Sequence, residues 1–335
     1  MRNFAILQFR NREKRKDAFA DAEAIVIKMK ILVISSANMD FVMNMHAVPA
    51  AGQTVIDNGT YRYVPGGKGA NSAMAFRRLG ADCTFCTRLG DDANGAALKK
   101  VYDDAGIDTS KTVIDRDNAT GLAAILVEAD GMNRIIVYPG ANHALTSDDV
   151  DRAFECQPDA VFMQLEIPSE IVIYTAGKAH ALGIPAILDA GPADEKFPLE
   201  KLDGLCVFSP NETEAEIFAG KAPDSETACL EVAKILESKV RAEYYVIKLG
   251  GRGAYLLRRG ETAGKLFHPF KTEVVDTTAA GDAFTAALTL EFLRTGDMER
   301  AVRYANAVGA ITVSRAGASP SIPTADEVEK FLETR

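Results

Sequence analysis

Short runs of consecutive apolar residues alternate along this chain with longer segments that carry apolar residues at helical spacing. The apolar runs span residues 31–35, 160–165, 185–189, 204–209 and 244–249. The segments with helical periodicity span residues 169–182, 227–238, 281–294 and 298–315. Continuous apolar runs of this length are typical of parallel strands that are buried on both faces. Strands that alternate with helices predict right-handed βαβ units, and therefore a doubly wound, mostly parallel α/β sheet with helices on both faces.

Two segments depart from this pattern, and in the first of them polar and apolar residues alternate. Residues 57–64 form one of them, and residues 121–128 and 133–138 lie on either side of the turn Ala129-Asp-Gly-Met132. Alternating strands joined by an Asp-Gly turn are typical of a β-hairpin. We therefore expect a small separate sheet, which in an α/β enzyme would serve as a lid over the site. The exposed edge of such a sheet needs a cover, and a second subunit would supply one.

The length of the chain predicts a main domain with an appendage. Its 335 residues exceed the roughly 250–300 residues at which a single core usually stops growing. We expect the main domain to span residues 29–335 and to include lid segments at about 41–64 and 119–139. Residues 1–28 contain a charged run and no apolar core typical of a signal peptide, so we interpret them as an N-terminal extension outside the core.

Composition and charge exclude some classes of function. The net charge of −9 argues against a nucleic-acid-binding protein, whose footprint is a basic stripe. The five cysteines are scattered through apolar segments, which favours reduced thiols in a cytoplasmic protein. Cys83 and Cys86 have CxxC spacing, but in a strand-like run over residues 82–89 their side chains would point to opposite faces, which disfavours a metal or redox site. No apolar run reaches the about 18–20 residues that a membrane helix needs.

The strongest chemical signal is the segment Asp276-Thr-Thr-Ala-Ala-Gly-Asp282, which leads into a predicted helix. Small residues allow the backbone to approach a ligand closely, and a helix N-terminus presents unpaired N–H groups at a positive dipole end. Ala279, Ala280 and Gly281 therefore predict an anion site, with Asp282 as a candidate base beside it. For this segment alone, an ordinary capped helix is the alternative interpretation.

A second glycine-rich segment, Gly66-Gly-Lys-Gly-Ala-Asn71, precedes a helix predicted over residues 72–79. It has neither the spacing of a Walker A loop nor that of the GxGxxG dinucleotide motif. Its glycines would bring the backbone close to a small polar ligand, while Lys68 and Asn71 add donors that suit hydroxyl groups. A simple loop before a helix is the alternative.

Asn38 and Asp40 follow the first apolar run, at the end of a strand where ligands of open α/β sheets bind. Because they are two residues apart, they share one face of an extended chain. An amide and a carboxylate on one face suit the hydroxyl groups of a sugar, which both donate and accept hydrogen bonds. The alternative is a strand-to-loop transition with turn-forming residues.

Two further segments also follow apolar runs. Ser209-Pro-Asn-Glu-Thr-Glu214 begins a helix, where acidic residues are common because of the helix dipole alone. Beside a phosphate site, however, such residues would hold Mg²⁺ through water, since Mg²⁺ keeps most of its hydration shell. Lys248-Leu-Gly-Gly-Arg-Gly253 is a glycine turn after a strand and suits a nucleotide that passes over the backbone.

Together and in this order, these segments resemble the ribokinase family of PfkB-type carbohydrate kinases, over residues from about 30 to 335. The resemblance implies a Rossmann-like domain with a small β-sheet lid and a homodimer formed through that lid. It also implies ATP and Mg²⁺ as cofactors and activation by a monovalent cation, K⁺. The implied reaction is the ATP-dependent phosphorylation of the terminal hydroxyl of a sugar.

The resemblance assigns roles to individual residues of this sequence. It implies a catalytic base and an anion hole at Asp282, Gly281, Ala280 and Ala279. The implied sugar contacts, including an apolar wall from the lid, are Asn38, Asp40, Gly66, Gly67, Lys68, Asn71, Glu166, Asp282, Ala123, Ile125 and Val137. The implied ATP contacts are Asn211, Lys248, Gly250, Gly251, Arg252, Gly253, Gly281 and Asn306. The implied metal ligands are Glu214 for Mg²⁺ through water and, for K⁺, Asp276, Thr278, Thr312, Arg315, Gly317 and Ser321.

The glycine motif favours D-ribose as the sugar, with D-ribose 5-phosphate as the product. The chain departs from the family at Leu188-Asp-Ala-Gly-Pro192, where ribokinases typically carry Asn-Pro-Ala-Pro. Deoxyribokinase, fructokinase, 2-keto-3-deoxygluconate kinase and nucleoside kinase activities are therefore alternatives. A non-catalytic sugar-binding protein is disfavoured because Asp282 and the glycine loop are intact, and an NAD-dependent dehydrogenase because GxGxxG is missing.

Overall fold

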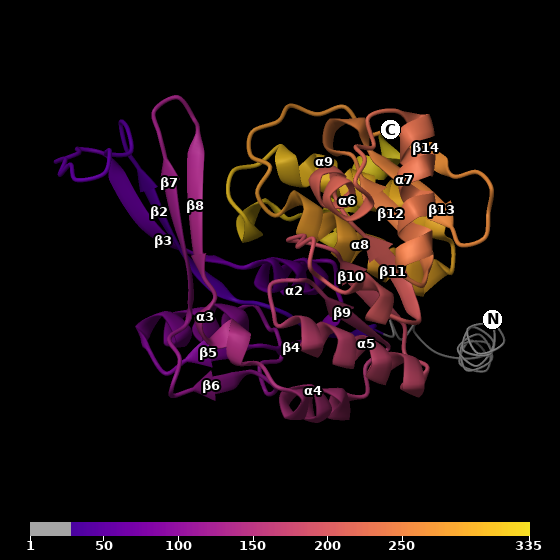
Figure 1. The fold of residues 1–335 in the computed structure, drawn as a ribbon, viewed down its shortest axis with the longest axis horizontal. Coiled ribbons are helices and arrows are strands. Elements are labelled where there is room, and N and C mark those ends of the chain that lie inside the picture. Colours follow the sequence, from indigo (N-terminus) through magenta and orange to yellow (C-terminus); the bar gives the residue numbers. More distant parts are fainter. Residues whose placement is uncertain (1–27) are drawn as a thin grey trace.

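The computed structural model describes residues 28–335, which are built around an eight-stranded sheet (Figure 1). The strands of this main sheet are β1 Lys30–Ile34, β4 Asp82–Cys86, β9 Ala160–Met163, β10 Ala186–Asp189, β11 Leu205–Ser209, β12 Ala242–Lys248, β13 Ala254–Arg258 and β14 Lys265–Phe267. Their spatial order is β14-β13-β12-β11-β10-β9-β1-β4. All neighbours from β4 to β12 pair in parallel, which confirms the predicted doubly wound, mostly parallel sheet.

Helices cover both faces of the main sheet and bury two apolar cores. One core packs against α2 Lys68–Arg78, α3 Ala93–Asp104, α8 Ala280–Thr295, α9 Met298–Val313 and α10 Ala325–Glu333. The other packs against α4 Ser147–Ala153, α5 Ser169–Leu182, α6 Glu212–Ala219 and α7 Glu226–Lys239. Alternate residues of β1 enter opposite cores: Ile31 and Val33 the first, Leu32 and Ile34 the second. This is why the strand has no polar face.

The connections after β1 fix where a ligand can bind. The chain passes from β1 to β4 on one side, and it later returns to place β9 on the other side of β1. Such a reversal of strand order opens a crevice at the carboxyl ends of the strands, where α/β proteins bind their ligands. Short 3₁₀ segments complete the connections at η2 Gly140–Ala144, η3 Phe154–Cys156, η4 Leu199–Lys201, η5 Gly250–Arg252 and η6 Ser319–Ser321.

A second, four-stranded sheet projects from the main domain and lies at the upper left of Figure 1. Its strands, in spatial order, are β3 Thr60–Gly66, β2 Asn38–Asn44, β7 Gly121–Val127 and β8 Asn133–Tyr138. β7 and β8 form the predicted hairpin. The register places Asp40 opposite Ala123 and Ala123 opposite Val137, so these three side chains share one face of the sheet.

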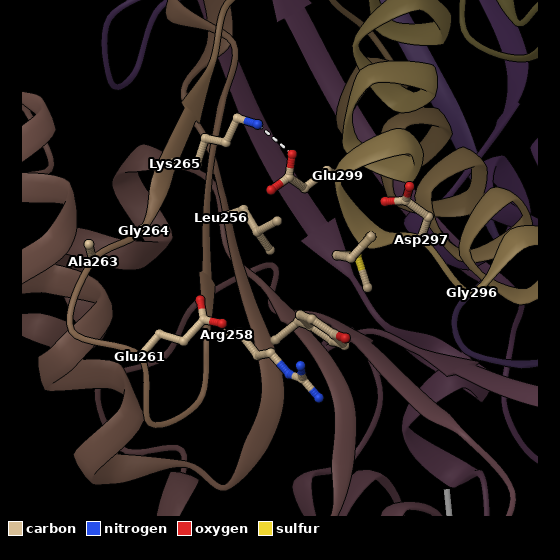
Figure 2. A pocket seen from close by; sticks show the side chains of 11 residues that line it. Leu256, Arg258, Glu261, Ala263, Gly264, Lys265, Gly296, Asp297 and Glu299 are labelled. Atoms are coloured by element: carbon tan, nitrogen blue, oxygen red, sulfur yellow. Dashed lines mark hydrogen bonds and ion pairs between the residues drawn. The ribbon is translucent and has the colours of Figure 1, made fainter. Parts of the chain in front are cut away.

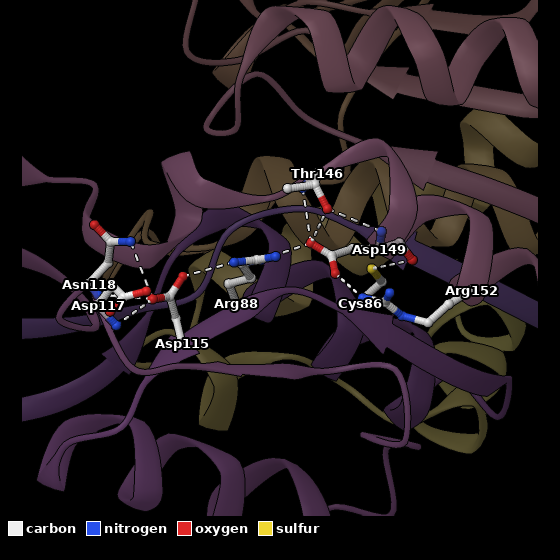
Figure 3. A network of polar contacts seen from close by, with 8 residues as sticks. All are labelled: Cys86, Arg88, Asp115, Asp117, Asn118, Thr146, Asp149 and Arg152. Atoms are coloured by element: carbon white, nitrogen blue, oxygen red, sulfur yellow. Dashed lines mark hydrogen bonds and ion pairs between the residues drawn. The ribbon is translucent and has the colours of Figure 1, made fainter.

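A buried ion-pair network lies at the base of this second sheet (Figure 3). Arg88, in the short strand β5 Arg88–Gly90, donates through Nη1 to Asp115 Oδ2 at 2.9 Å and through Nε to Asp149 Oδ2 at 2.8 Å. Asp115 ends β6 Val113–Asp115, and its carboxylate also accepts the N–H groups of Asp117 and Asn118. The network therefore joins α4 to the segment that leads into β7.

The structure corrects several predicted boundaries. The helix predicted to begin at residue 72 begins at Lys68, because Gly67 adopts φ +89° and ends the loop earlier. The alternating strand predicted over residues 57–64 is β3, which begins at Thr60. The run over residues 82–89 is divided between β4 of the main sheet and β5, which pairs with β6 instead. The antiparallel strands β13 and β14, which complete the main sheet beside β12, were not predicted.

Cys83 and Cys86 lie in opposite apolar cores, as the strand pattern predicts. Within residues 28–335, no helix is both long and apolar enough to cross a membrane. The predicted N-terminal extension, apart from Lys28, lies outside the described residues.

Candidate active site

Polar side chains from four strands of the main sheet converge at its carboxyl edge. Ser35 and Ser36 follow β1, and Gln164 follows β9. Asp189 ends β10, and Lys248 ends β12. All five residues are less than one-tenth exposed, and they face the N-terminal end of α8, where Asp282 lies. The carboxyl edge of the main sheet thus carries a buried polar cluster.

Asp282 contributes a buried carboxylate to the cluster and is 6% exposed. It accepts hydrogen bonds from Asn71 Nδ2 at 2.9 Å and from Gln164 Nε2 at 3.1 Å. Burial raises its pKa to about 6, although Lys68 nearby opposes this shift. A carboxylate with a pKa close to neutral pH is ionised in the cell and still able to accept a proton, as a general base must be. The predicted base and the predicted glycine loop thus meet in space.

The N-terminus of α8 beside Asp282 is open. Ala279 is the N-cap residue and adopts the left-handed conformation with φ +61°, and no side chain caps the helix. Left-handed backbone is uncommon for alanine and costs about 1–2 kcal/mol, so the turn is held by its surroundings. Of the predicted anion hole, Ala280 donates its N–H to the carbonyl of Thr277 at 3.3 Å, whereas the N–H groups of Ala279 and Gly281 donate to no backbone carbonyl within the described residues.

The glycine loop fits closely against β2, the first strand of the second sheet. A Cβ atom on Gly66 would lie 2.1 Å from Asp40 Oδ2, and one on Gly67 would lie 2.7 Å from the backbone nitrogen of Asn38. Side chains at these two positions would therefore displace the predicted sugar contacts. Burial, together with the charge of Glu166, raises the pKa of Asp40 to about 7. Asp40 and Glu166 thus lie close enough to interact electrostatically.

Glu166, Lys68 and Asn71 border the same space. Glu166 Oε2 accepts hydrogen bonds from Ser36 Oγ and from the backbone N–H of Lys68 at 3.2 Å. The charge of Asp282 raises the pKa of Lys68, against the effect of its burial. Asn71 Oδ1 is buried and accepts no hydrogen bond within the described residues. A buried acceptor without a partner costs free energy, which a ligand hydroxyl would recover.

The predicted apolar wall lies on the face of the second sheet that carries Asp40. Ala123 is 5% exposed, whereas Val137 is 48% exposed and Ile125 is intermediate. The wall is thus buried at Ala123 in β7 and exposed at Val137, directly opposite in the edge strand β8, which suits a surface that covers a ligand only when it is bound.

The predicted nucleotide residues are held by contacts within the protein. Asn211 Oδ1 caps α6 by accepting from the N–H of Glu214 at 2.9 Å. Arg252 donates to Glu212 Oε1 at 2.6 Å, and Asn306 Nδ2 donates to the carbonyl of Phe267 at 3.2 Å. Gly250 and Gly253 adopt positive φ and close the turn after β12. The side chains of Arg252 and Asn306 therefore shape this turn and its neighbour. The N–H groups of Arg252 and Gly253 donate to the carbonyls of Leu249 and Gly250, so those of Gly250 and Gly251 are the backbone donors that the turn leaves for a ligand.

The predicted metal ligands fall in two places. Glu214 is 6% exposed, and its Oε1 lies only 2.0 Å from a Cβ built on Gly191, so its carboxylate borders the segment after Asp189. Asp276 Oδ2 accepts the N–H of Gly317 at 2.9 Å, which joins the two predicted K⁺ segments. Other members of the K⁺ set also bond within the protein: Ser321 Oγ to Ala318, Thr312 Oγ1 to Val308, Arg315 to Glu327, and Thr278 to Asp276.

A cavity elsewhere has different chemistry. It has a volume of about 420 Å³ and lies between β13, β14 and the turn from α8 to α9 (Figure 2). Its rim charges are exposed, and Lys265 pairs with Glu299 there. Exposed, paired charges give a ligand little to bind. The convergent buried groups lie at the strand ends instead, so we place the functional site there.

Sequence reasoning missed two residues that support the site. Gln164 is fully buried, and its Nε2 lies within hydrogen-bond distance of Ser72 Oγ, Asp189 Oδ2 and Asp282 Oδ1. Asn142 Nδ2 donates to Asn38 Oδ1 at 2.8 Å, and Asn142 also bonds both backbone groups of Ala37. The one available signal for Gln164 was an amide at the end of an otherwise apolar strand.

Comparisons with known proteins identify the family of the chain. The family described as pfkB family carbohydrate kinase matches residues 28–325. The chain is 34% identical over 310 residues to the ribokinase of Haemophilus influenzae, and this alignment covers 92% of this chain and 99% of that protein. It is 37% identical over 302 residues to the bifunctional ribokinase/ribose-5-phosphate isomerase A of Fructilactobacillus sanfranciscensis, covering 89% of this chain and 55% of that protein. The structure of Arabidopsis thaliana ribokinase complexed with ribose and ATP superposes with a TM-score of 0.82 at 32% identity, over 92% of this chain and 99% of that one.

Proposed function

Because the chain belongs to the pfkB family of carbohydrate kinases, we propose that it transfers the terminal phosphoryl group of ATP to the terminal hydroxyl of D-ribose. The product would be D-ribose 5-phosphate. The observation that carries this proposal is the buried carboxylate of Asp282. It lies at the uncapped N-terminus of α8 and accepts a hydrogen bond from Asn71, one of the amide and carboxylate groups proposed to bind the sugar hydroxyls.

Asp282 is the proposed general base. Its carboxylate accepts the proton of the terminal hydroxyl while that oxygen forms a bond to the γ-phosphorus and the bond from phosphorus to the leaving oxygen of ADP breaks. Asn71 and Gln164 hold the carboxylate in place with one hydrogen bond each. Such fixed positioning matters because phosphoryl transfer depends mainly on alignment and on charge stabilisation.

The sugar would lie between the glycine loop and the second sheet. Asn38, Asp40, Glu166 and Asn71 offer carboxylate and amide groups for its hydroxyls. Gly66 and Gly67 leave the room that side chains would otherwise occupy, as their close approach to Asp40 and Asn38 indicates. Lys68 adds a cation whose charge is favoured by Asp282. Several hydrogen bonds to hydroxyls would give strong discrimination, because a sugar that lacks one leaves a buried group unpaired.

The anion hole would stabilise the phosphoryl group in transit. The N–H groups of Ala279 and Gly281 would donate to it at a helix N-terminus that no side chain caps, where the dipole favours negative charge, and Ala280 would contribute once its N–H leaves the carbonyl of Thr277. The turn from Lys248 to Gly253 would accept the nucleotide along its backbone, with Asn211 and Asn306 on its borders. Hydrogen-bond donors that are already in place need not move when negative charge develops on the phosphoryl group. Such electrostatic stabilisation is usually the largest single contribution to catalysis.

The residues present fit both implied cations. Glu214 supplies a buried carboxylate beside the phosphate region, as a water-mediated Mg²⁺ site requires. When bound, Mg²⁺ would neutralise charge on the phosphate oxygens. For K⁺, we propose side-chain oxygens of Asp276 and Ser321 and backbone carbonyls of Thr278, Thr312, Arg315 and Gly317. The hydrogen bond from Gly317 to Asp276 supports this set, because it holds the two segments together.

We further propose that the second sheet is a lid within a domain that spans residues 29–335, with lid segments at about 41–64 and 119–139. Its apolar wall of Ala123, Ile125 and Val137 would close over the sugar and exclude water that would hydrolyse ATP. The other face carries exposed aromatic residues, with Tyr61 and Tyr63 both more than half exposed beside Phe41. A homodimer formed through this face would cover them.

The test is a coupled assay of ADP release by the purified chain with ribose, deoxyribose, fructose and nucleosides, with and without K⁺. We expect ribose to give the highest kcat/KM and K⁺ to raise the rate. Deoxyribose is the sharpest competitor, since it lacks a single hydroxyl. No sugar-dependent ADP release from any of these acceptors would overturn the proposal.

A further inference from the structure

A buried ion pair lies beside the proposed phosphoryl site, at the position where the chain departs from the family pattern. Lys248 and Asp189 form it, and their side chains are only 10% and 5% exposed. Lys248 Nζ also lies 3.3 Å from Thr285 Oγ1, on the first turns of α8. A Cβ atom built on Gly281 would be 3.9 Å from the same nitrogen. The ammonium group therefore lies at the mouth of the proposed anion hole.

Lys248 has a donor left for a ligand. An ammonium group has three N–H donors, and the described residues accept two of them, at Asp189 and Thr285. Asp189 is fixed in turn, because its other oxygen lies 3.4 Å from Gln164 Nε2. Gln164 also binds Asp282, so one amide links the counterion of Lys248 to the proposed base. The pair is thus built into the site rather than exposed beside it.

We propose that Lys248 is a further catalytic residue, whose ammonium binds the phosphoryl group during transfer, and that Asp189 is the positioning residue that aims it. The inference rests on the kinase function proposed above. As the sugar oxygen bonds to the γ-phosphorus and its proton passes to Asp282, negative charge is shared between the phosphoryl oxygens and the leaving oxygen of ADP. A fixed cation at the anion hole stabilises that charge, while Asp189 offsets the burial of the cation.

Ligand affinities test the proposal, since ADP lacks the group that Lys248 would contact. Lys248→Met keeps the length of the side chain and removes its charge. In calorimetric titrations with ribose and Mg²⁺, we expect this variant to bind the non-hydrolysable analogue AMP-PNP about 10–100-fold more weakly than the wild type and ADP within about twofold. We expect kcat to fall about 10²–10³-fold. Lys265→Met, at a surface ion pair with Glu299, is the matched control and should change neither value.

The pH profile separates catalysis from a structural role. Asp282 faces three charged side chains, Lys68, Asp189 and Lys248, besides the two amides that bind it. Asp189→Asn removes a negative charge, so the acidic limb of kcat/KM should move to lower pH by up to about one unit. Lys248→Met removes a positive charge, so the limb should move to higher pH. Loss of packing alone would not produce shifts of opposite sign.

Lys248→Met leaves Asp189 buried without its cation and could fail to fold. The double variant Asp189→Asn/Lys248→Met removes both charges and serves in that case. We expect it to retain near wild-type affinity for ADP and weakened affinity for AMP-PNP. Equal losses for both nucleotides, or pH shifts in the same direction, would overturn the role of Lys248. Absence of sugar-dependent ADP release by the wild type would instead overturn the kinase proposal, so the two failures are distinguishable.

Discussion

Replacement of Asp282 by asparagine removes the proposed base while the size and the planar shape of the side chain are kept. An amide cannot take up the proton of the sugar hydroxyl, so we expect kcat to fall by about 10²–10⁴-fold. The amide oxygen still accepts a hydrogen bond, so the Kd for ribose should change little. A loss of activity alone would not separate a base from a residue that holds the fold, and the stability of the variant is therefore the sharper measurement.

The structure predicts that this variant is more stable than the wild type near neutral pH. Burial raises the pKa of Asp282 from 3.8 to about 6, which corresponds to a cost of about 2–3 kcal/mol for the ionised form in the folded state. Asparagine avoids that cost. Its NH₂ group, however, would face a donor of Asn71 or Gln164, at a cost of about 1 kcal/mol. The net gain should be about 1–2 kcal/mol, or roughly 2–6 °C in Tm.

The size of the stability gained by Asp282→Asn depends on pH. The folded state binds the proton of Asp282 more tightly than the unfolded chain does, so the wild type loses stability as pH rises from about 4 to about 6. The advantage of Asp282→Asn should therefore be full at about pH 7.5 and small at about pH 4.5. Calorimetric unfolding at both values measures it. Asp203→Asn, which alters an exposed carboxylate that pairs with Arg241, is the matched control.

Two results would refute the reasoning on Asp282. Turnover near that of the wild type would exclude a role as base. A Tm lowered by the same amount at both pH values would show that the carboxylate stabilises the folded chain, as an ordinary helix cap does. The expected combination, a more stable and nearly inactive enzyme, is typical of groups that are kept for function at a cost in stability.

Three further predictions concern the surroundings of the site. Gly67→Ala forces a side chain into a backbone at φ +89° and against Asn38, so we expect a loss of about 1–3 kcal/mol in chemical denaturation and weaker ribose binding. Asn142→Ala removes the donor that orients Asn38, so the KM for ribose should rise about tenfold while the KM for ATP stays within about twofold. Arg88→Met leaves the buried carboxylate of Asp115 without its cation and Asp149 with Arg152 alone, so unfolding should become easier by about 3–5 kcal/mol; an unchanged midpoint would contradict this.

Five strands of the main sheet, β1, β9, β10, β11 and β12, were predictable because each contains a continuous apolar run buried between two layers of helices. The start of α2 was not, since three glycines within four residues are typical of a loop. Here Gly66 ends β3, Gly67 turns the chain at φ +89°, and Gly69 lies in the helix, so close to Ser35 and Ser36 that no side chain would fit. The strand β13 was missed for a different reason: its direction depends on the positive φ of Gly253, which residue identity alone does not specify.

The candidate site was likewise predictable from the sequence only in part. The segments that carry Asp282 and Asn71 were recognised because each combines small residues with a polar side chain at a predicted helix start. Gln164 was not, because its partner Asp282 is 118 residues away and no local pattern announces that contact. Asp189 stood out only as a departure from the family pattern, and its ion pair with Lys248 needed the fold to become visible.

The central claim is that this chain moves a phosphoryl group from ATP to the terminal hydroxyl of ribose. The most direct measurement is ³¹P NMR of the products that the purified wild-type enzyme forms from ATP and ribose in the presence of Mg²⁺ and K⁺. The account predicts a phosphomonoester on C5 of ribose, formed in equal amount with ADP, and no free phosphate. ADP formed together with inorganic phosphate and unmodified ribose would contradict it.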